Sequence, residues 1–395
     1  MQKKIIAVAV AALASTAAFA QTNVTVYGVV DVQQAFVKSS NAVSGANQTS
    51  VGRLDSHGNY IGFKGVEDLG NGLKAVFVYE TAISADAGGA FSGTRDSYIG
   101  LAGGFGTVAA GNLTHPLRAF GAKVELLPGA AGFGTTASVT GTIAGLKTGA
   151  DDRASNAVAY ISPSFGGFTA IGAYVNGENK PSSSVNTKAW QLAGQYENGP
   201  LFVGAGYHRA NDATFAAAKA ATFAASADPL FVDAGGNVGV VQTAAASAAT
   251  MADKARVIRV VAAYTLPSNT KLTALYDNTK TTGTTGAVTG ELKRQAYSFG
   301  VAQGFGKNTV GLEYARANKL KLNGGEVADT SVNILTAMYG YELSKRTMLH
   351  ARYSRLNNGN SAFNTNFYNL PVSNGVAGSA GSDYTGFSVG LRHSF

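Results

Sequence analysis

The chain ends on Phe387-Ser-Val-Gly-Leu-Arg-His-Ser-Phe395, a stretch in which apolar residues occupy every second position except His393. Successive side chains of a β-strand point to opposite faces, so this period of two predicts a strand with one face in a nonpolar medium. The residues between them are small or polar. The opposite face is therefore not part of a second apolar core.

The same alternation recurs from Val24 onward, for example over 168–175 and 201–208. Each stretch holds about ten residues with high β-propensity and ends in a break rich in Gly, Asn, Ser or Pro. Repetition of this unit along the whole chain predicts an all-β protein.

The breaks are alternately short and long, which is typical of a transmembrane barrel with tight periplasmic turns and long extracellular loops. Seven short breaks and eight long ones join about sixteen strands. The short breaks are 68–72, 103–106, 163–167, 198–200, 266–269, 304–308 and 343–346, and the long ones are 38–52, 84–94, 113–152, 178–186, 211–254, 281–290, 320–329 and 358–381. In lipid such a sheet must close, because an open edge leaves unpaired backbone groups. The sequence therefore predicts a 16-stranded antiparallel transmembrane β-barrel with both termini on the periplasmic side.

The alternative fold is a soluble β-sandwich or propeller, which needs two apolar inner faces. Here the faces opposite the apolar ones carry Lys74, Glu80, Arg153, Arg392 and many of the 50 glycines. Within the long break 211–254, the Ala-rich segments 214–227 and 244–252 have helical propensity. They are expected at most to decorate the mouth of the barrel.

The first twenty residues match an export signal. Lys3 and Lys4 precede an apolar stretch over 5–13, and Ala18-Phe19-Ala20 fits the small-x-small rule for cleavage. Beyond this segment no apolar run reaches the length of a transmembrane helix. We therefore expect a signal peptide at 1–20 and one barrel domain at 21–395, with a net charge of +6 once two of the 31 basic residues are removed.

Several segments resemble the trimeric general porins of β-proteobacteria, and the terminal Phe395 resembles the signal by which outer-membrane barrels are recognised for assembly. The matching segments are Val24-Thr-Val-Tyr-Gly-Val-Val-Asp31, Ile61-Gly-Phe-Lys-Gly-Val-Glu-Asp-Leu-Gly70, Tyr98-Ile-Gly-Leu101, Pro163-Ser-Phe-Gly-Gly-Phe168, Tyr341-Glu-Leu-Ser-Lys-Arg-Thr347 and Val389-Gly-Leu-Arg-His-Ser-Phe395. They run from one end of the mature chain to the other.

This resemblance implies a general diffusion porin of the cell outer membrane, a homotrimer that passes ions and small hydrophilic solutes without a cofactor or metal. It also implies contact with outer-membrane lipid, lipopolysaccharide and the barrel-assembly machinery, and no contact with nucleic acid. A substrate-specific outer-membrane channel is the main alternative.

In the family, the third extracellular loop folds inward and narrows the channel. That loop corresponds to 112–152, and its charged residues Arg118, Lys123 and Glu125 are expected at the constriction. A solvated loop over the mouth is the alternative for this segment.

On the facing wall, Arg153 and Arg95 fall at basic positions of the family. Two positions depart from the family pattern, because Tyr60 and Asn112 stand where arginine is common. Lys64 is four residues from Tyr60, so both side chains are expected on the same face of the strand. Lys64 is therefore expected to replace part of the positive charge that is lost at the constriction.

The expected result is a weak anion preference that is lost or reversed by Arg153→Glu. Charge at the narrowing dominates because exposed loop charges are screened beyond about 8 Å in physiological salt. Glu125, Asp151 and Asp152 oppose the basic residues.

Enzymatic and other functions find little support. The chain has no cysteine, its five histidines lack a metal-ligand spacing, and no Gly-x-Ser-x-Gly motif is present. An adhesin or purely structural barrel stays open, and conductance in planar bilayers would distinguish it from a porin.

Overall fold

The computed structural model describes residues 23–42, 47–88, 91, 94–143, 146–178, 187–215, 250–285, 288–359 and 381–395. The predicted signal peptide and its cleavage site lie outside the described residues, as does most of the Ala-rich segment. No helix among the described residues is long and apolar enough to cross a membrane.

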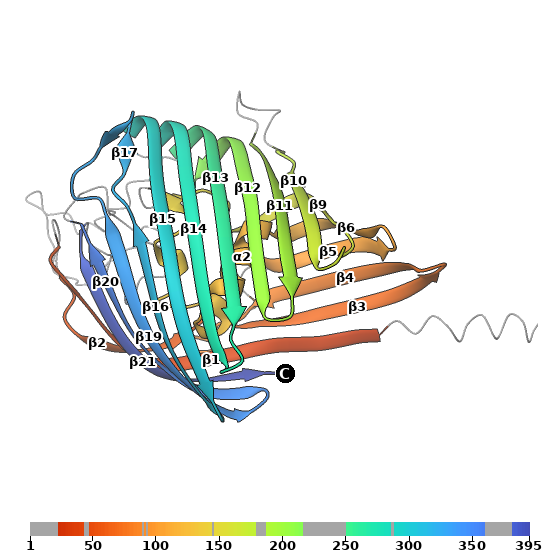
Figure 1. Ribbon diagram of the computed structural model, residues 1–395, viewed down its shortest axis with the longest axis horizontal. Helices are drawn as coiled ribbons and strands as arrows, with labels where there is room; N and C mark the ends of the chain where they lie inside the picture. Colours follow the sequence, from red (N-terminus) through yellow and green to blue (C-terminus); the bar gives the residue numbers. More distant parts are fainter. Residues whose placement is uncertain are drawn as a thin grey trace, which may run out of the picture.

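The chain folds into one closed antiparallel β-barrel of sixteen strands, as the sequence predicts (Figure 1). The second of these strands is interrupted and consists of β2 and β3. In order round the barrel the strands are β1 (Asn23–Ser40), β2 (Val51–Ser56) with β3 (Tyr60–Gly70), β4 (Leu73–Ala82), β5 (Thr94–Gly103), β6 (Gly106–Thr114), β9 (Arg153–Ile161), β10 (Phe168–Val175), β11 (Lys188–Asn198), β12 (Leu201–Phe215), β13 (Thr250–Thr265), β14 (Thr270–Thr285), β15 (Val288–Phe305), β16 (Asn308–Ala317), β19 (Val332–Ser344), β20 (Thr347–Asn358) and β21 (Asp383–Ser394).

The barrel closes where the last strand pairs with the first. The β1–β21 ladder runs from Val29↔Ser394 to Ser40↔Asp383. Beyond it, the amide and carbonyl of Phe395 exchange two 3.1 Å hydrogen bonds with those of Gly28. A Cβ at Gly28 would lie 2.5 Å from the Phe395 ring. It would also lie 2.5 Å from the backbone carbonyl oxygen of Tyr60, so glycine at position 28 leaves the room that the Phe395 ring occupies against β1.

The seven predicted short turns are all present at one end of the barrel. In the β3–β4 hairpin, for example, Asn71 and Gly72 have φ of 53° and 77°. These positive values suit the tight turns that match the twist of paired strands.

The predicted loop at 281–290 is wrong. β14 and β15 continue as one hairpin whose ladder reaches Thr285↔Val288. The glycines of this stretch suggest a break, but its threonines are β-branched and pair across the hairpin.

The helical propensity of the Ala-rich segments is also overridden where they are described. β12 runs on to Phe215 and β13 begins at Thr250, with Ala213 paired to Ala252. Ladder hydrogen bonds between two long neighbouring strands outweigh a preference of a few tenths of a kcal/mol per residue.

The two faces of the barrel differ as the alternation predicts. The outer face exposes large apolar side chains such as Ile99, Leu192 and Phe299, which are 66%, 60% and 58% exposed. The inner face carries charged and small residues, among them Asp31, Arg259 and Arg352. Between β16 and β19 a short hairpin of β17 (Lys321–Leu322) and β18 (Gly325–Glu326) pairs with the upper part of β15.

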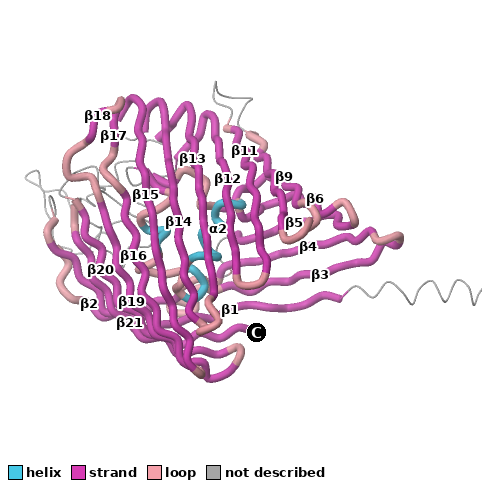
Figure 2. Tube along the Cα trace, viewed as in Figure 1, coloured by secondary structure: helices cyan, strands magenta, loops and turns pink. Residues whose placement is uncertain are grey.

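The segment 115–152, called the inner loop below, folds into the barrel (Figures 1 and 2). It contains α2 (Pro116–Val124), two single-turn 3₁₀ helices, η1 (Pro128–Ala130) and η2 (Thr136–Ser138), and the small hairpin of β7 (Thr142–Ile143) and β8 (Leu146–Lys147). α2 packs against the inner face of β11–β14.

The apolar face of α2 fixes this docking. Phe120 meets Phe202 of β12 edge to face, with ring centroids 6.1 Å apart. Opposite the helix, a Cβ at Gly204 would lie 2.9 Å from Phe120, and one at Gly206 would lie 2.6 Å from Leu117. Two glycines of β12 thus make room for the helix, and the alternative of a solvated loop over the mouth is wrong.

Candidate functional site

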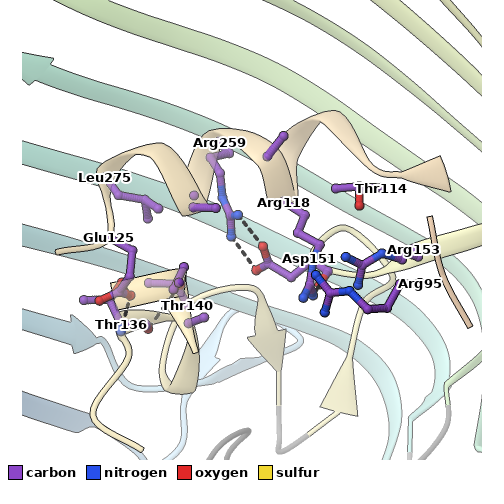
Figure 3. A pocket seen from close by; sticks show the side chains of 16 residues that line it. Arg95, Thr114, Arg118, Glu125, Thr136, Thr140, Asp151, Arg153, Arg259 and Leu275 are labelled. Atoms are coloured by element: carbon purple, nitrogen blue, oxygen red, sulfur yellow. Dashed lines mark hydrogen bonds and ion pairs between the residues drawn. The ribbon is translucent and has the colours of Figure 1, made fainter. Parts of the chain in front are cut away.

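A cavity lies inside the barrel between the inner loop and the wall formed by β5 and β9 (Figure 3). Small residues line much of it, including Ala119, Ala122 and Ala130. Its charged lining consists of Arg95, Arg118, Arg153, Arg259, Glu125 and Asp151. Four of the seven residues predicted from sequence are therefore brought together, namely Arg95, Arg118, Glu125 and Arg153.

Arg95 is held by two neighbours on the wall. Its Nε lies 3.1 Å from Oε2 of Glu80 on β4. Its guanidinium also lies over the Tyr60 ring, 4.3 Å from the centroid. Tyr60, which stands where the family commonly has arginine, thus supplies an aromatic platform for Arg95.

Arg153, the first residue of β9, is also paired. Its Nε lies 3.1 Å from Oδ1 of Asp96. The Thr114 hydroxyl donates to the same carboxylate at 2.7 Å. Asp96 is thus the counter-ion of Arg153.

Arg118 reaches the cavity from the opposite side, on α2. Its guanidinium donates to the backbone carbonyl of Asp151. Among the described residues, no carboxylate lies within ion-pair distance of it. The guanidiniums of Arg95, Arg118 and Arg153 converge (Figure 3), and only that of Arg118 lacks a carboxylate partner in the described part of the chain.

Glu125 is turned into the inner loop. Its Oε2 accepts 2.8 Å hydrogen bonds from the backbone amide and the hydroxyl of Thr136. The carboxylate is buried by these contacts, with the residue 8% exposed. It therefore fixes the fold of the loop as well as lining the cavity.

Two predicted residues lie away from this cavity. Lys64 faces the lumen on the same side of its strand as Tyr60, as predicted. Its Nζ lies over the Tyr27 ring, 4.9 Å from the centroid, and not in the cavity. Lys123 pairs with Glu197 of β11 and lies over the Phe202 ring, 4.4 Å from its centroid.

Arg259 of β13 anchors the inner loop, and sequence reasoning missed it. The residue is 1% exposed. Its Nε and Nη2 donate to Asp277 of β14 at 2.7 and 2.6 Å. Its other bonds go to the inner loop, to the Leu117 carbonyl at 2.8 Å and to the Asp151 carboxylate. The sequence did hold a signal, an arginine at an inward position of the apolar stretch Val257-Ile-Arg-Val-Val261.

A second anchor joins the tip of the inner loop to the opposite wall. Nη1 of Arg352 on β20 donates to the carbonyls of Ala131 and Phe133 at 2.9 and 3.3 Å. Beside it, Asp31 contacts His350 and Arg392 at 2.9 and 3.2 Å. The inner loop is thus fixed to both walls and divides the interior.

The histidine nearest the cavity is held within the inner loop. His115 is buried at the start of the inner loop, and desolvation lowers its pKa, so the ring is neutral at physiological pH. In the described part of the chain, no three His, Asp or Glu side chains gather as a metal site.

Comparison with known proteins gives one consistent result. A family model described as Gram-negative porin matches residues 7–361. The chain is 31% identical to outer membrane porin protein 32 of Delftia acidovorans, over 100% of both chains. It is 29% identical to an outer membrane porin protein of Bordetella pertussis, over 89% of this chain and 93% of the relative. Among solved structures, an anion-selective porin from Comamonas acidovorans superposes with a TM-score of 0.72 and 27% identity, covering 95% of this chain and all of that one.

Proposed function

The chain belongs to the Gram-negative porin family, and we propose that it forms a general diffusion channel with a weak preference for anions. It is an outer-membrane barrel that passes ions and small hydrophilic solutes down their gradients. The observation that carries the anion preference is the convergence of Arg95, Arg118 and Arg153 across the cavity beside the inner loop.

The mechanism needs no bond to be made or broken. A barrel of sixteen strands is wide enough to hold water, and the inner loop reduces its open cross-section. A water-filled narrowing selects by radius and by the sign of fixed charge. Arginine suits this role because it stays protonated at any physiological pH.

The ion pairs explain why we propose a weak preference. Glu80 and Asp96 offset Arg95 and Arg153 at 3.1 Å each. Asp151 and Asp277 offset Arg259. Arg118 is therefore the arginine of the cavity lining whose positive charge is not paired with a carboxylate of the described residues, although the family resemblance singles out Arg153.

The test is the zero-current potential across a planar bilayer with a KCl gradient. We expect the wild type to show a small potential of anion sign. Arg118→Glu should reverse its sign, since it places an acid beside two arginines that are already paired. Arg153→Glu should abolish or reverse the preference too, because it also leaves Asp96 without its partner.

A matched control is Lys307→Glu, which makes the same charge change on an exposed turn residue between β15 and β16. Screening should leave its potential close to that of the wild type. A wild-type potential of cation sign, or one that ignores both arginine substitutions, would rule out the proposed selectivity. Currents blocked by one solute at low concentration would favour a substrate-specific channel instead.

We also propose a homotrimer and cleavage of the signal peptide after Ala20. Lipid-facing and protomer-facing surfaces are both apolar, so the exposed outer face by itself does not distinguish them. Native mass spectrometry in mild detergent measures both points. We expect three times the mass of a chain that begins at Gln21, and a single-chain mass would contradict the trimer.

A further inference from the structure

Five basic residues form a continuous row on the outer face of the barrel. Each lies directly opposite the next across neighbouring strands. In order they are Arg209 on β12, Arg256 on β13, Lys280 on β14, Lys293 on β15 and Lys321 on β17, and we call them the cationic row. Their outward direction is set by alternation. The residues on either side of Arg256, for example, are Ala255 and Val257, both fully buried on the inner face.

Such a row is unfavourable by itself, because like charges directly opposite each other on a sheet repel. Acidic partners are few. Glu291 pairs with Lys280, and Glu326 lies 3.9 Å from Lys321. No carboxylate of the described residues lies within ion-pair distance of Arg256 or Lys293. At the β17 end, Arg316 and Lys319 add further positive charge round the same cavity as Lys293 and Lys321.

The position of the cationic row along the strands indicates which layer of the membrane surrounds it. A spanning strand takes about 9–11 residues, and the row lies roughly that far along the strands from the short periplasmic turns. On the same outward face Trp190 lies directly opposite Arg209, and Tyr207, Tyr276 and Tyr297 lie two to four residues nearer those turns than the row. Aromatic girdles of this kind mark the interface of the membrane. The cationic row is therefore at the level of the outer-leaflet headgroups.

An apolar groove begins two outward positions below the row on β13–β15. It is lined by Val260, Ala262, Ala274, Tyr276, Tyr297 and Phe299. Alanines form a low floor between aromatic side chains. Gln295, one outward position from Lys293, donates to the Tyr276 hydroxyl at 2.9 Å and holds that ring in place. The groove has the shape and polarity for an acyl chain.

We propose that this surface binds a phosphorylated, acylated lipid of the outer leaflet, with lipopolysaccharide as the partner. Its phosphate groups lie on the cationic row, where they offset the repulsion between the five side chains. One of its acyl chains lies in the groove. A free anion would bind to the cationic row only. The apolar groove beside it is the feature that favours a lipid over a free anion. The proposal rests on the outer-membrane location of the proposed channel.

The experiment measures binding of bisphosphorylated lipid A to the detergent-solubilised protein. The test variant is Arg256→Gln/Lys293→Gln. The control is Lys38→Gln/Arg355→Gln, which removes two exposed outward charges on β1 and β20, the two strands that flank β21 at the barrel seam. We expect the test variant to bind about thirtyfold more weakly than the wild type, and the control to match the wild type. Equal binding by both variants would overturn the proposal.

Three further arms identify the ligand. Dephosphorylated lipid A should bind weakly to all variants. Ala274→Phe, which fills the groove, should weaken lipid A binding and leave any binding of inorganic phosphate unchanged. If inorganic phosphate displaces lipid A at equal concentration, or if Ala274→Phe has no effect, the surface is not a lipid site.

Stability and conductance give independent readouts. Without lipid, the test variant should unfold at a higher temperature than the wild type, because repulsion along the row is relieved. Addition of lipid A should raise the unfolding temperature of the wild type more than that of the test variant. An equal rise in both proteins would contradict the proposal. Channel conductance of the test variant should match that of the wild type, so a failure here is distinguishable from a failure of the proposed channel function.

Discussion

Replacement of Arg259 by leucine is expected to release the inner loop and to give larger, noisier conductance steps in planar bilayers. Arg259 binds the Leu117 carbonyl and the Asp151 carboxylate of the loop while it is held by Asp277 of the wall. Without the guanidinium, two carboxylates face each other in a buried site. Breaking a buried ion pair in this way costs about 3–5 kcal/mol. Movement of the loop away from the wall relieves that cost.

A second arginine on the same face of the barrel provides the control. Arg294 of β15 is also buried on the inner face and donates to the Thr330 carbonyl at 2.9 Å, outside the inner loop. Arg294→Leu should leave the conductance step near the wild-type value. Arg259→Leu/Asp277→Leu should recover part of the quiet, smaller step, because it removes one of the two facing acids. A folded Arg259→Leu barrel with wild-type conductance would show that this residue does not hold the loop.

Deletion of Phe395 is expected to remove most of the folded, heat-modifiable protein from the outer membrane. The deletion loses both 3.1 Å hydrogen bonds with Gly28, which extend the ladder that closes the barrel. It also removes the terminal aromatic that resembles the recognition signal for barrel assembly. Fractionated outer membranes, run with and without heating, measure the result.

Two comparisons separate closure of the barrel from recognition of its end. Phe305→Ala removes another exposed aromatic, at the turn end of β15, and should leave the amount of assembled protein unchanged. Refolding of the purified deletion variant into detergent tests closure without the assembly machinery. Successful refolding together with failure in cells would assign the defect to recognition. Normal amounts in the outer membrane after deletion would refute the predicted role.

The local sequence was enough to predict the strands and turns of the barrel. Alternation with a period of two and the residue types of a tight turn both involve positions that are close together in the chain. Both the strand in 201–208 and the turn at Asn71-Gly72 could be predicted from their own residues. At 281–290 the local pattern is misleading, because its glycines suggest a loop. There the pairing of Thr284 with Thr289 and Thr285 with Val288 across the hairpin extends the strands. These partners are close in sequence, but the pairing depends on the register of the whole hairpin, which local composition does not reveal.

The candidate site was predicted only in part, for the same reason. Family resemblance and parity identified Arg95, Arg118, Glu125 and Arg153, and all four line the cavity. The sequence did not show which of these arginines is paired with a carboxylate. The partner of Arg153 is Asp96, 57 positions away, and only the β5–β6–β9 ladder brings their side chains to 3.1 Å.

The sequence by itself determined the period, the turns and the polarity of each face, because these follow from side chains that are neighbours along a strand. It therefore specified a barrel with an apolar exterior, a charged interior and a long third loop. Tertiary structure alone decided where that loop is anchored, since Arg259 meets Asp151 across 108 positions. It also decided which guanidinium keeps its charge unpaired and that five outward cations lie side by side. Electrostatic energy depends on distances through space, and closure of the barrel sets those distances.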